Sequence, residues 1–211
     1  MSRFSTSFTF RRLVPVAVIE RVEDAVPLAE ALLAGGLDII EVTLRTEAAL
    51  GAMQQIRAAC PGMIVGAGTV IDPEIVPQLA DIGVEFAVAP GLNERVVEAA
   101  ANASLPLTPG VITPSEIEQA RGYGLKLLKF FPAEQFGGAK TLKALAGPYG
   151  HTGIKFVPTG GIDLAKAKDY WALSCVAAVG GSWFVSPKLI AEGKFDEVTR
   201  LTAEALAMGR G

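Results

Sequence analysis

The sequence has one histidine, two cysteines and no long apolar run. Cys60 and Cys175 are too few, and too far apart in the sequence, for a disulfide framework, which indicates a reducing compartment such as the cytoplasm. His151 lies in a stretch that contains glycine and proline, where we expect a surface loop. A single histidine gives metal binding and histidine catalysis little to draw on, so we expect no metal and no other cofactor.

Neither sign of charge predominates. The net charge is −3, the pI is near 5.3 and no basic block stands out, which argues against nucleic acid as a partner. No run of 18 apolar residues predicts a membrane span. The first residues, 1–12, lack the apolar core of a secretion signal. Half of the residues are hydrophobic and 19% are charged, which is typical of a compact globular protein.

What the chain does have is an alternation of short β-branched apolar runs with longer runs rich in Ala, Leu and Glu. The predicted strands are 13–19, 38–44, 63–69, 85–89, 105–109, 127–131, 155–159 and 175–180. The predicted helices are 23–34, 47–59, 73–82, 93–103, 114–122, 138–146 and 163–172, with a last one from about 187 to the C-terminus. Several of these helices have a capping residue or a first-turn proline at the start, namely Asp72-Pro73, Asn93, Thr113-Pro114 and Asp163.

Eight strand–helix units predict an α/β protein built as a single (β/α)8 TIM barrel, with residues 1–211 as one domain. An open doubly wound sheet is the alternative. That fold normally has a glycine-rich turn after its first strand, whereas Val18-Ile19-Glu20-Arg21 stands here. Residues 1–12 precede the first strand, and we expect an N-terminal extension or a short helix that plugs the barrel bottom.

Three polar residues alternate with aliphatic ones in and just after the second predicted strand. Glu41, Thr43 and Arg45 occupy every second position, which places them on one face of a strand, near the mouth of a barrel. Four residues of extended chain span roughly 13 Å, too far for an ion pair between Glu41 and Arg45 in a straight strand. Two opposite charges held apart suit a ligand between them, and an internal ion pair is the alternative.

One lysine stands inside a run that otherwise has the character of a buried strand. Lys129 lies between Leu128 and Phe130. A lone charge costs several kcal/mol to bury unless it is paired or loses its charge. A neutral lysine amine is a nucleophile toward carbonyl carbon, which is the first requirement of Schiff-base chemistry. The alternative is a strand-end lysine whose head group reaches water.

Glycines follow the last two predicted strands. Thr159-Gly160-Gly161 and Gly180-Gly181-Ser182 stand where barrels of this type commonly bind phosphate. Glycine lets backbone N–H groups approach an anion closely, although ordinary turns are the alternative in a chain with 23 glycines. Gly66-Ala67-Gly68-Thr69 and Pro90-Gly91 end the third and fourth strands, where they allow close approach of backbone to ligand.

Six motifs, in the same order and over essentially the whole chain, resemble those of a known family. They are Glu41-Val42-Thr43-Leu44-Arg45-Thr46, Val65-Gly66-Ala67-Gly68-Thr69-Val70, Ala89-Pro90-Gly91-Leu92, Lys129-Phe130-Phe131-Pro132-Ala133-Glu134, Pro158-Thr159-Gly160-Gly161-Ile162 and Gly180-Gly181-Ser182-Trp183. The family is that of the 2-keto-3-deoxy-6-phosphogluconate (KDPG) and 4-hydroxy-2-oxoglutarate (KHG) aldolases. The segment 107–113 departs somewhat from the family pattern and involves no catalytic residue.

The resemblance implies a role for each matching residue. Lys129 forms an imine with the C2 carbonyl of the substrate, and Glu41 is the general acid/base that moves protons through water. Arg45 and Thr69 hold the pyruvate carboxylate, and Thr159 lies beside the aldehyde carbonyl. The resemblance further implies substrate-binding roles for Pro90, Gly160, Gly161, Gly180, Gly181 and Ser182, of which Gly160, Gly161, Gly181 and Ser182 cradle the distal phosphate.

The resemblance also implies the reaction and the assembly. The expected enzyme is a class I aldolase of the Entner–Doudoroff pathway, a homotrimer of barrels without metal, acting on a small 2-keto-3-deoxy acid phosphate. It would cleave KDPG to pyruvate and glyceraldehyde 3-phosphate, and KHG to pyruvate and glyoxylate. The alternatives are an aldolase for the phosphogalactonate epimer, a non-catalytic sugar-phosphate-binding barrel and a metal-dependent aldolase, against which the scarcity of histidine argues.

Overall fold

The computed structural model describes residues 11–209, an α/β protein in which the paired strands run parallel. Its strands are β1 (Leu13–Ala17), β2 (Ile39–Thr43), β3 (Ile64–Gly68), β4 (Phe86–Val88), β5 (Leu107–Thr108), β6 (Gly110–Val111), β7 (Leu127–Phe130), β8 (Lys155–Pro158) and β9 (Val179–Gly181). Each is buried on both faces along most of its length, as expected for parallel strands covered by helices.

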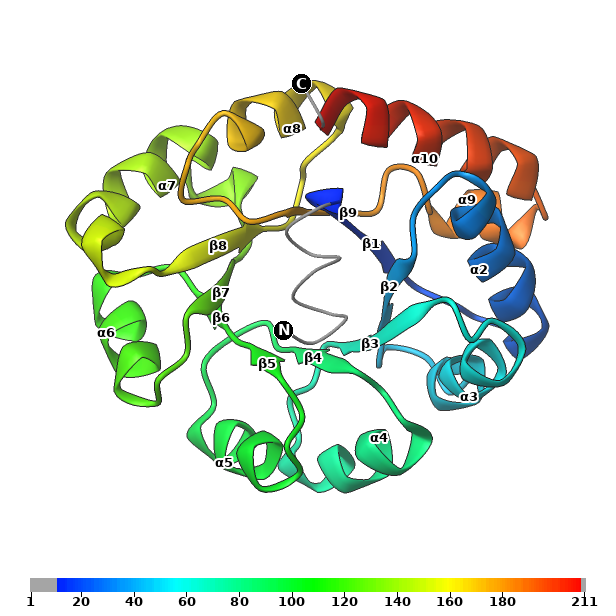
Figure 1. Ribbon diagram of the computed structural model, residues 1–211, viewed down its shortest axis with the longest axis horizontal. Helices are drawn as coiled ribbons and strands as arrows, with labels where there is room; N and C mark the ends of the chain where they lie inside the picture. Colours follow the sequence, from blue (N-terminus) through cyan, green and yellow to red (C-terminus); the bar gives the residue numbers. More distant parts are fainter. Residues whose placement is uncertain (1–10, 210–211) are drawn as a thin grey trace.

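The strands form two sheets around one axis (Figure 1). The larger sheet has the order β5-β4-β3-β2-β1-β9 and the smaller one β6-β7-β8. Only Pro109 separates β5 from β6 in the chain, and two isolated parallel bridges, Phe156–Val176 and Thr159–Gly180, connect the β8 edge with the segment around β9. The strands therefore bring their C-terminal ends to the same end of the molecule.

Two of the predicted strands differ from those observed. The fifth, 105–109, is observed only as β5, and the chain continues as β6 past its predicted end, with Pro109, which has no N–H to give to a ladder, between the two. The eighth, 175–180, begins later, at Val179. The chain is still turning at its predicted start, where the N–H of Val176 donates to the carbonyl of Leu173 at 3.0 Å.

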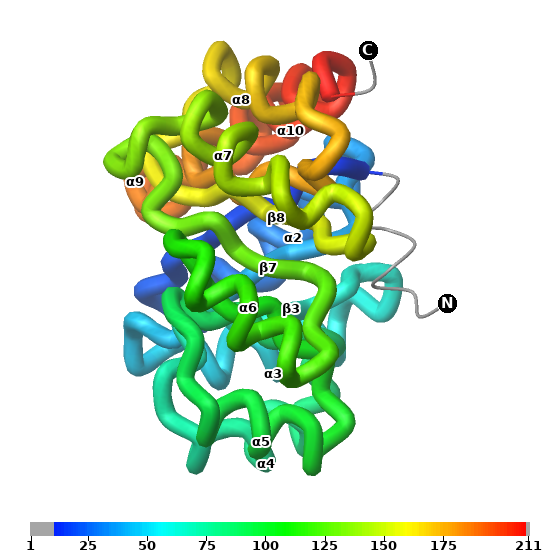
Figure 2. Tube along the Cα trace, turned by 90° about the vertical axis from the view of Figure 1, so that its left-hand side faces the viewer, coloured from blue at the N-terminus to red at the C-terminus, as the bar shows by residue number. Residues whose placement is uncertain are grey.

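Helices surround the sheets (Figures 1 and 2). They are α2 (Ala25–Ala34), α3 (Ala49–Ala59), α4 (Val76–Ile82), α5 (Glu94–Asn102), α6 (Pro114–Gly122), α7 (Gly138–Ala146), α8 (Leu164–Trp171), α9 (Pro187–Ala191) and α10 (Phe195–Gly209). Short 3₁₀ helices lie at Val22–Asp24, Pro73–Ile75, Glu134–Phe136 and Gly147–Thr152. The last predicted helix is thus two helices, which separate where Gly193 adopts φ of 63°.

The predicted caps are mostly confirmed. The side chains of Asn93 and Asp163 accept hydrogen bonds from Arg95 N and Lys166 N. Thr113 forms a capping box with Glu116, in which each side chain accepts from the other residue's backbone N–H. Asp72 caps no N–H with its side chain, and its helix begins instead as a 3₁₀ turn.

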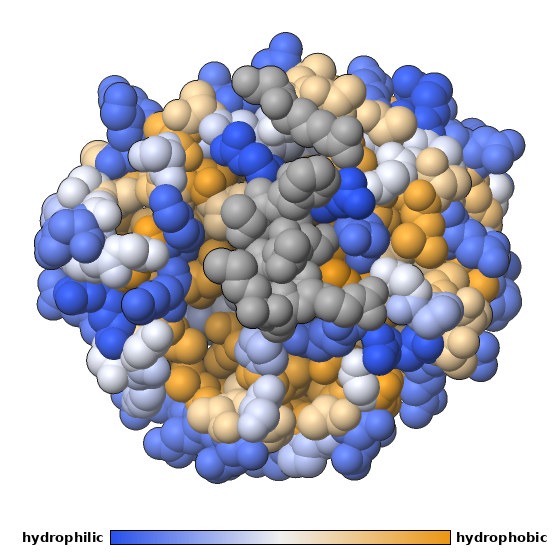
Figure 3. All heavy atoms as spheres, viewed as in Figure 1, coloured by the Kyte–Doolittle hydropathy of each residue, from blue (hydrophilic) through white to orange (hydrophobic). Residues whose placement is uncertain are grey.

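The core lies between the sheets and the helices, and hydrophilic side chains gather at the rim formed by the helices (Figure 3). Phe86, Phe130, Phe156, Phe184 and Tyr170 are among its largest buried side chains. Within residues 11–209, no helix combines the length and the apolar character that a bilayer crossing requires. The predicted N-terminal extension or plug, 1–12, lies almost entirely outside the described residues.

Candidate active site

A cavity of about 260 Å³ opens at the C-terminal ends of β1, β8 and β9. The residues that line it are Val16, Val18, Arg45, Phe131, Thr159, Gly160, Gly161, Ile162, Gly180, Gly181, Ser182 and Pro187. Seven of the eleven predicted site residues are among them: Arg45, Thr159, Gly160, Gly161, Gly180, Gly181 and Ser182. Parallel strands bring their carboxyl ends together, which is why residues from distant parts of the sequence meet here.

Lys129 and Glu41 face each other beside this cavity. The Nζ atom of Lys129 lies 3.5 Å from Oε1 of Glu41, and both side chains are more than 90% buried. Oε1 of Glu41 has no hydrogen-bond partner within the described chain, and the ammonium of Lys129 is its ion-pair partner there. The sequence suggested either a buried reactive lysine or a strand-end lysine whose head group reaches water, and in the structure Lys129 is buried and paired with Glu41.

The surroundings of the pair connect it to the cavity. Glu41 lies in register with Val16 of β1, which lines the cavity. Nζ of Lys129 lies 5.0 Å from the centre of the Phe131 ring, a cation–π distance, and Phe131 also lines the cavity. A Cβ atom at Gly68 would overlap the Glu41 carboxylate, so glycine at this position provides the room that the carboxylate occupies.

Arg45 reaches the cavity from a turn rather than from the strand. β2 ends at Thr43, and Arg45 N–H donates to the Thr43 carbonyl at 2.8 Å, which turns the chain. The hydroxyl of Thr46 donates to the carbonyl of Ile19 at 2.6 Å and so anchors this turn to the loop after β1. Glu41 and Thr43 thus occupy alternate positions of β2, as the prediction of one shared strand face requires, whereas the prediction was wrong for Arg45, which lies in the turn beyond the strand and is exposed.

The turn after β8 is held by its carbonyl groups. The carbonyl of Thr159 accepts from Ala133 N–H at 2.8 Å, and that of Gly160 accepts from Glu134 N–H at 3.1 Å. A trans peptide directs its C=O and N–H to opposite sides, so the N–H groups of Gly160 and Gly161 point away from these donors. Among the described residues, Gly161 N–H has no hydrogen-bond acceptor. Positive φ at Gly160 (106°) and Gly161 (73°) makes the turn one that glycine adopts without strain.

The second glycine segment packs tightly against the first. Gly180 forms a parallel bridge with Thr159, and a Cβ atom at Gly180 would overlap the Thr159 hydroxyl. A Cβ atom at Gly181 would overlap the ring of Trp183. Ser182 follows directly and is exposed at the cavity. Glycine at these two positions therefore lets the end of β9 approach Thr159 and Trp183 closely.

Thr69 and Pro90 are the two predicted site residues that neither line the cavity nor belong to the Lys129–Glu41 pair. Both are half-buried and follow β3 and β4. Thr69 comes directly after Gly68, which touches the Glu41 carboxylate, and has φ of 60°, an uncommon value for a β-branched residue. Its backbone strain next to Glu41 is the kind of feature that marks functional sites.

Five residues that line the cavity were not predicted as site residues: Val16, Val18, Phe131, Ile162 and Pro187. One of them had a usable signal. Phe131 stands two residues after Lys129, so the alternation of a strand places both side chains on one side. Val16 and Val18 are ordinary strand aliphatics, and nothing in the local sequence marks Pro187.

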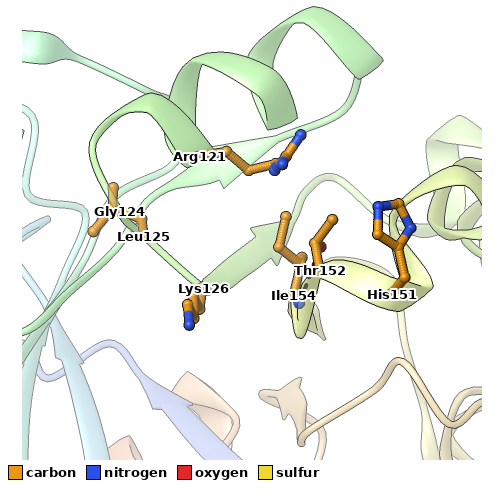
Figure 4. Close-up of a pocket in the computed structure, with 7 residues that line it drawn as sticks. All are labelled: Arg121, Gly124, Leu125, Lys126, His151, Thr152 and Ile154. Atoms are coloured by element: carbon orange, nitrogen blue, oxygen red, sulfur yellow. Dashed lines mark hydrogen bonds between the residues drawn. The ribbon is translucent and has the colours of Figure 1, made fainter.

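A second cavity, of about 300 Å³, lies at the other end of the strands (Figure 4). Its lining includes Leu125 and Lys126, just before β7, and Thr152 and Ile154, just before β8. His151 also lines it and is exposed, as predicted, but it belongs to the 3₁₀ helix Gly147–Thr152 rather than to a loop. Residues that precede parallel strands lie opposite the catalytic end of such folds, so this cavity is separate from the candidate active site.

Comparisons with known proteins agree with the geometry. Residues 5–201 match the family described as KDPG and KHG aldolase. The 2-dehydro-3-deoxy-phosphogluconate aldolase of Dickeya dadantii is 48% identical over 195 residues, which cover 92% of this chain and 91% of that protein. The KHG/KDPG aldolase of Escherichia coli K12 is 46% identical over 194 residues, 92% of this chain and 90% of that protein.

A solved structure is also similar along the whole chain. The crystal structure of KDPG aldolase from Legionella pneumophila, with pyruvate captured at low pH as a covalent carbinolamine intermediate, gives a TM-score of 0.92 at 39% identity. The match covers 97% of this chain and 98% of that chain. The α/β fold with parallel strands is thus shared with that enzyme.

Proposed function

The chain belongs to the KDPG and KHG aldolase family, and from that premise we infer that it is a class I aldolase, a carbon–carbon lyase that works through a Schiff base. Its substrate is 2-dehydro-3-deoxy-6-phosphogluconate, which it cleaves to pyruvate and glyceraldehyde 3-phosphate. It also cleaves 4-hydroxy-2-oxoglutarate to pyruvate and glyoxylate. The observation that supports this most strongly is the buried pair of Lys129 and Glu41 beside a cavity bordered by free backbone N–H groups.

Lys129 is the nucleophile in this proposal. An ammonium must lose a proton before it attacks a carbonyl, and Glu41 Oε1 at 3.5 Å is positioned to receive it, directly after a small approach or through one bridging water. The free amine adds to the C2 carbonyl to give a carbinolamine, which loses water to give the protonated imine. The carbinolamine of pyruvate in the Legionella enzyme is the corresponding intermediate of a relative.

The protonated imine then accepts the electrons of the breaking bond. A base removes the proton of the C4 hydroxyl, the C3–C4 bond breaks, the aldehyde leaves, and the electron pair of that bond forms the enamine of pyruvate. Protonation at C3 and hydrolysis of the imine release pyruvate and restore the amine of Lys129. We assign the proton transfers to Glu41, which is the acidic group nearest to Lys129 in the described structure.

Two groups of residues bind the ends of the substrate. Arg45 has the planar guanidinium that pairs with a carboxylate in two hydrogen bonds, and it borders the cavity, so we assign it to the pyruvate carboxylate together with Thr69. Thr159 borders the cavity between the two glycine turns, and we assign its hydroxyl to the aldehyde oxygen. Pro90 receives only a supporting role, because it lies outside the cavity lining.

The phosphate is assigned to the turn after β8 and to the end of β9. Gly160 and Gly161 form a turn with positive φ, the geometry of an anion-binding nest, and Gly161 N–H has no acceptor among the described residues. Gly180, Gly181 and Ser182 border the same cavity from the other side, and the Ser182 hydroxyl is exposed to it. Backbone N–H groups and a hydroxyl are hydrogen-bond donors suited to a phosphate.

We also propose that the two sheets together make one closed (β/α)8 barrel that forms a single domain. The short interruption at Pro109 and the two bridges near β9 support closure at both places where the sheets meet. The resemblance to the family further suggests a homotrimer. Analytical ultracentrifugation tests this assembly, and a monomer at micromolar concentration would contradict it.

Trapping of the imine tests the mechanism. Incubation with pyruvate and borohydride should leave a stable secondary amine on the peptide that contains Lys129, as read by mass spectrometry of a digest. Lys126 lies just before β7 and Lys155 at the start of β8, and both serve as internal controls because both are exposed. An adduct on those lysines alone would refute the assignment. A protein that only binds sugar phosphates would retain no covalent pyruvate.

Substrate preference requires a comparison of three compounds. Pyruvate release should be measured side by side from KDPG, its phosphogalactonate epimer and KHG. If kcat/KM is higher for the epimer than for KDPG, the epimer is the main substrate, and the proposed chemistry is unchanged. Activity that a strong chelator removes would favour the metal-dependent alternative instead.

A further inference from the structure

Three polar side chains outside the assigned machinery form a network behind the Gly160-Gly161 turn. Nζ of Lys166, in the first turn of α8, donates to the carbonyl of Gly161 at 3.0 Å and lies 3.6 Å from Oε2 of Glu134. The other carboxylate oxygen of Glu134 accepts from the hydroxyl of Tyr170 at 2.6 Å. Burial, and then the hydrogen bond to Glu134, raise the pKa of Tyr170, which therefore remains a neutral donor.

This network completes the set of partners that orient the turn. The carbonyls of Thr159 and Gly160 accept backbone N–H groups, and that of Gly161 accepts the Lys166 ammonium. With the Gly161 carbonyl directed at Lys166, the next N–H, that of Ile162, points to the other side of the peptide. Ile162 N–H donates no hydrogen bond to the described residues, and Ile162 lines the cavity. The fixed carbonyls of Gly160 and Gly161 thus leave the next N–H groups, those of Gly161 and Ile162, without an acceptor among the described residues.

Lys166 acts through the backbone in this arrangement rather than as a bare positive charge. Its ammonium lies 3.6 Å from Glu134 and 3.7 Å from Asp163, so two carboxylates already compensate it. Asp163 also caps α8 by accepting from Lys166 N–H at 2.9 Å, which fixes the first turn of the helix that carries the lysine. Lys166 does not line the cavity itself.

We propose that Lys166 and Glu134 are positioning residues that fix the Gly160-Gly161 turn for the phosphate and thereby set the preference for phosphorylated over unphosphorylated 2-keto acids. This inference rests on the proposed aldolase function. Glu134 lies five residues after Lys129, and its N–H donates to the Gly160 carbonyl. The Gly160-Gly161 turn is therefore connected to the segment that follows the nucleophile. Binding energy from the phosphate can then align the reacting lysine.

The wild-type enzyme provides the reference that separates this inference from the proposed function. It must release pyruvate from KDPG and from KHG, and it must give the borohydride adduct on Lys129. Failure of these measurements would refute the aldolase proposal itself. If these measurements succeed, the variants below test only the positioning role of Lys166 and Glu134.

The first variants change the lysine. Lys166→Met keeps the aliphatic stem and removes the donor to Gly161, so kcat/KM for KDPG should fall about tenfold, the usual effect of losing one charge-assisted hydrogen bond. The value for KHG should change less than about twofold, because that substrate has no phosphate. Lys166→Arg keeps a donor and should recover most of the loss. Lys168→Met, on the same helix but away from the turn and equally exposed, is the matched control.

Inorganic phosphate provides a readout that does not depend on turnover of a long substrate. It should inhibit cleavage of KDPG competitively in the wild type, with an inhibition constant about tenfold higher in Lys166→Met. Melting temperatures of all variants show whether the fold is intact. Equal losses on KDPG and KHG, or an unchanged phosphate inhibition constant in Lys166→Met, would overturn the inference.

Glu134→Gln distinguishes a positioning role of Lys166 from direct contact between Lys166 and phosphate, because the two roles predict opposite changes in kcat/KM for KDPG. If Lys166 bound phosphate directly, removing the competing carboxylate would strengthen phosphate binding. If the pair fixes the turn, Glu134→Gln loosens Lys166, and kcat/KM for KDPG should fall about threefold or more while the value for KHG is kept. An improved KDPG value in this variant would overturn the positioning role.

Discussion

Replacing Glu41 by glutamine should both slow and destabilise the enzyme, because the structure gives Glu41 two tasks. Its carboxylate is the counter-charge of a buried ammonium, with Oε1 and Nζ of Lys129 3.5 Å apart, and it is the proposed proton carrier. Glutamine has nearly the same size, so the substitution removes the charge and leaves the packing against Gly68 largely unchanged. The effect therefore reports on electrostatics rather than on shape.

The magnitude follows from the geometry. At 3.5 Å and an effective dielectric constant of about 20, two unit charges attract with about 5 kcal/mol. Removing one partner of a buried pair typically costs about 3–5 kcal/mol, since the remaining charge stays desolvated. The free energy of unfolding of Glu41→Gln should thus fall by about 3 kcal/mol or more. As an acid/base, Glu41 should contribute about 10²–10⁴-fold to kcat.

Urea unfolding and pyruvate release measure the two effects separately. Glu85→Gln is the matched control, because Glu85 pairs with Arg57 at 2.8 Å in a more exposed place and should lose at most about 1 kcal/mol. A Glu41→Leu/Lys129→Met double variant removes both charges and should be more stable than Glu41→Gln, though inactive. The reasoning would be refuted by a Glu41→Gln enzyme as stable as the wild type with near-normal turnover.

Three further perturbations give equally definite expectations. Ser182→Glu places a carboxylate at the proposed phosphate site, so kcat/KM should fall about 100-fold for KDPG and far less for KHG, and equal losses on both substrates would mean that this loop does not bind phosphate. Gly66→Ala puts a Cβ into the ring of Phe86, and urea unfolding should show a loss of about 1–3 kcal/mol, whereas a Cβ at Gly62 would meet no atom within 4 Å, so Gly62→Ala should show little change. Although burial acts to raise the pKa of Glu116, hydrogen bonds from Ile112 N–H and from the hydroxyl and N–H of Thr113 lower it overall, so the stability that charged Glu116 contributes is present above its ordinary pKa of 4.5 and is lost as the pH falls through the lower folded value. Glu116→Gln should therefore be less stable near neutral pH and should lose less stability on acidification, and parallel unfolding curves of the two proteins down to acidic pH would contradict this.

The sequence by itself determined the elements and their order. Hydrophobic periodicity and capping residues act over a few positions, so runs such as 38–44 and 127–131, and the caps at Asn93, Thr113 and Asp163, could be recognised locally. Lys129 was identifiable because a charge inside an apolar strand needs an explanation wherever the strand lies. The glycines at the C-terminal ends of β8 and β9 were identifiable because folds of this kind bind ligands at the C-terminal ends of their parallel strands.

Local patterns were insufficient where one part of the chain depends on another. The start of β9 was misplaced because strand length depends on neighbours, and the chain is still turning at Val176. Arg45 was assigned to a strand face because alternation continues past Thr43, whereas hydrogen bonds from the turn and from Thr46 end the strand there. A periodic pattern contains no information about these partners.

Only the tertiary structure decided which charges meet. Glu41 and Lys129 lie on β2 and β7, in different sheets, and their pairing follows from the arrangement of the strands around one axis. In the same way, Lys166 reaches the Gly161 carbonyl because α8 packs behind the turn after β8. A side chain's chemistry is fixed by its identity, but its partner is fixed by distances across the fold, which are set when the helices and sheets pack together.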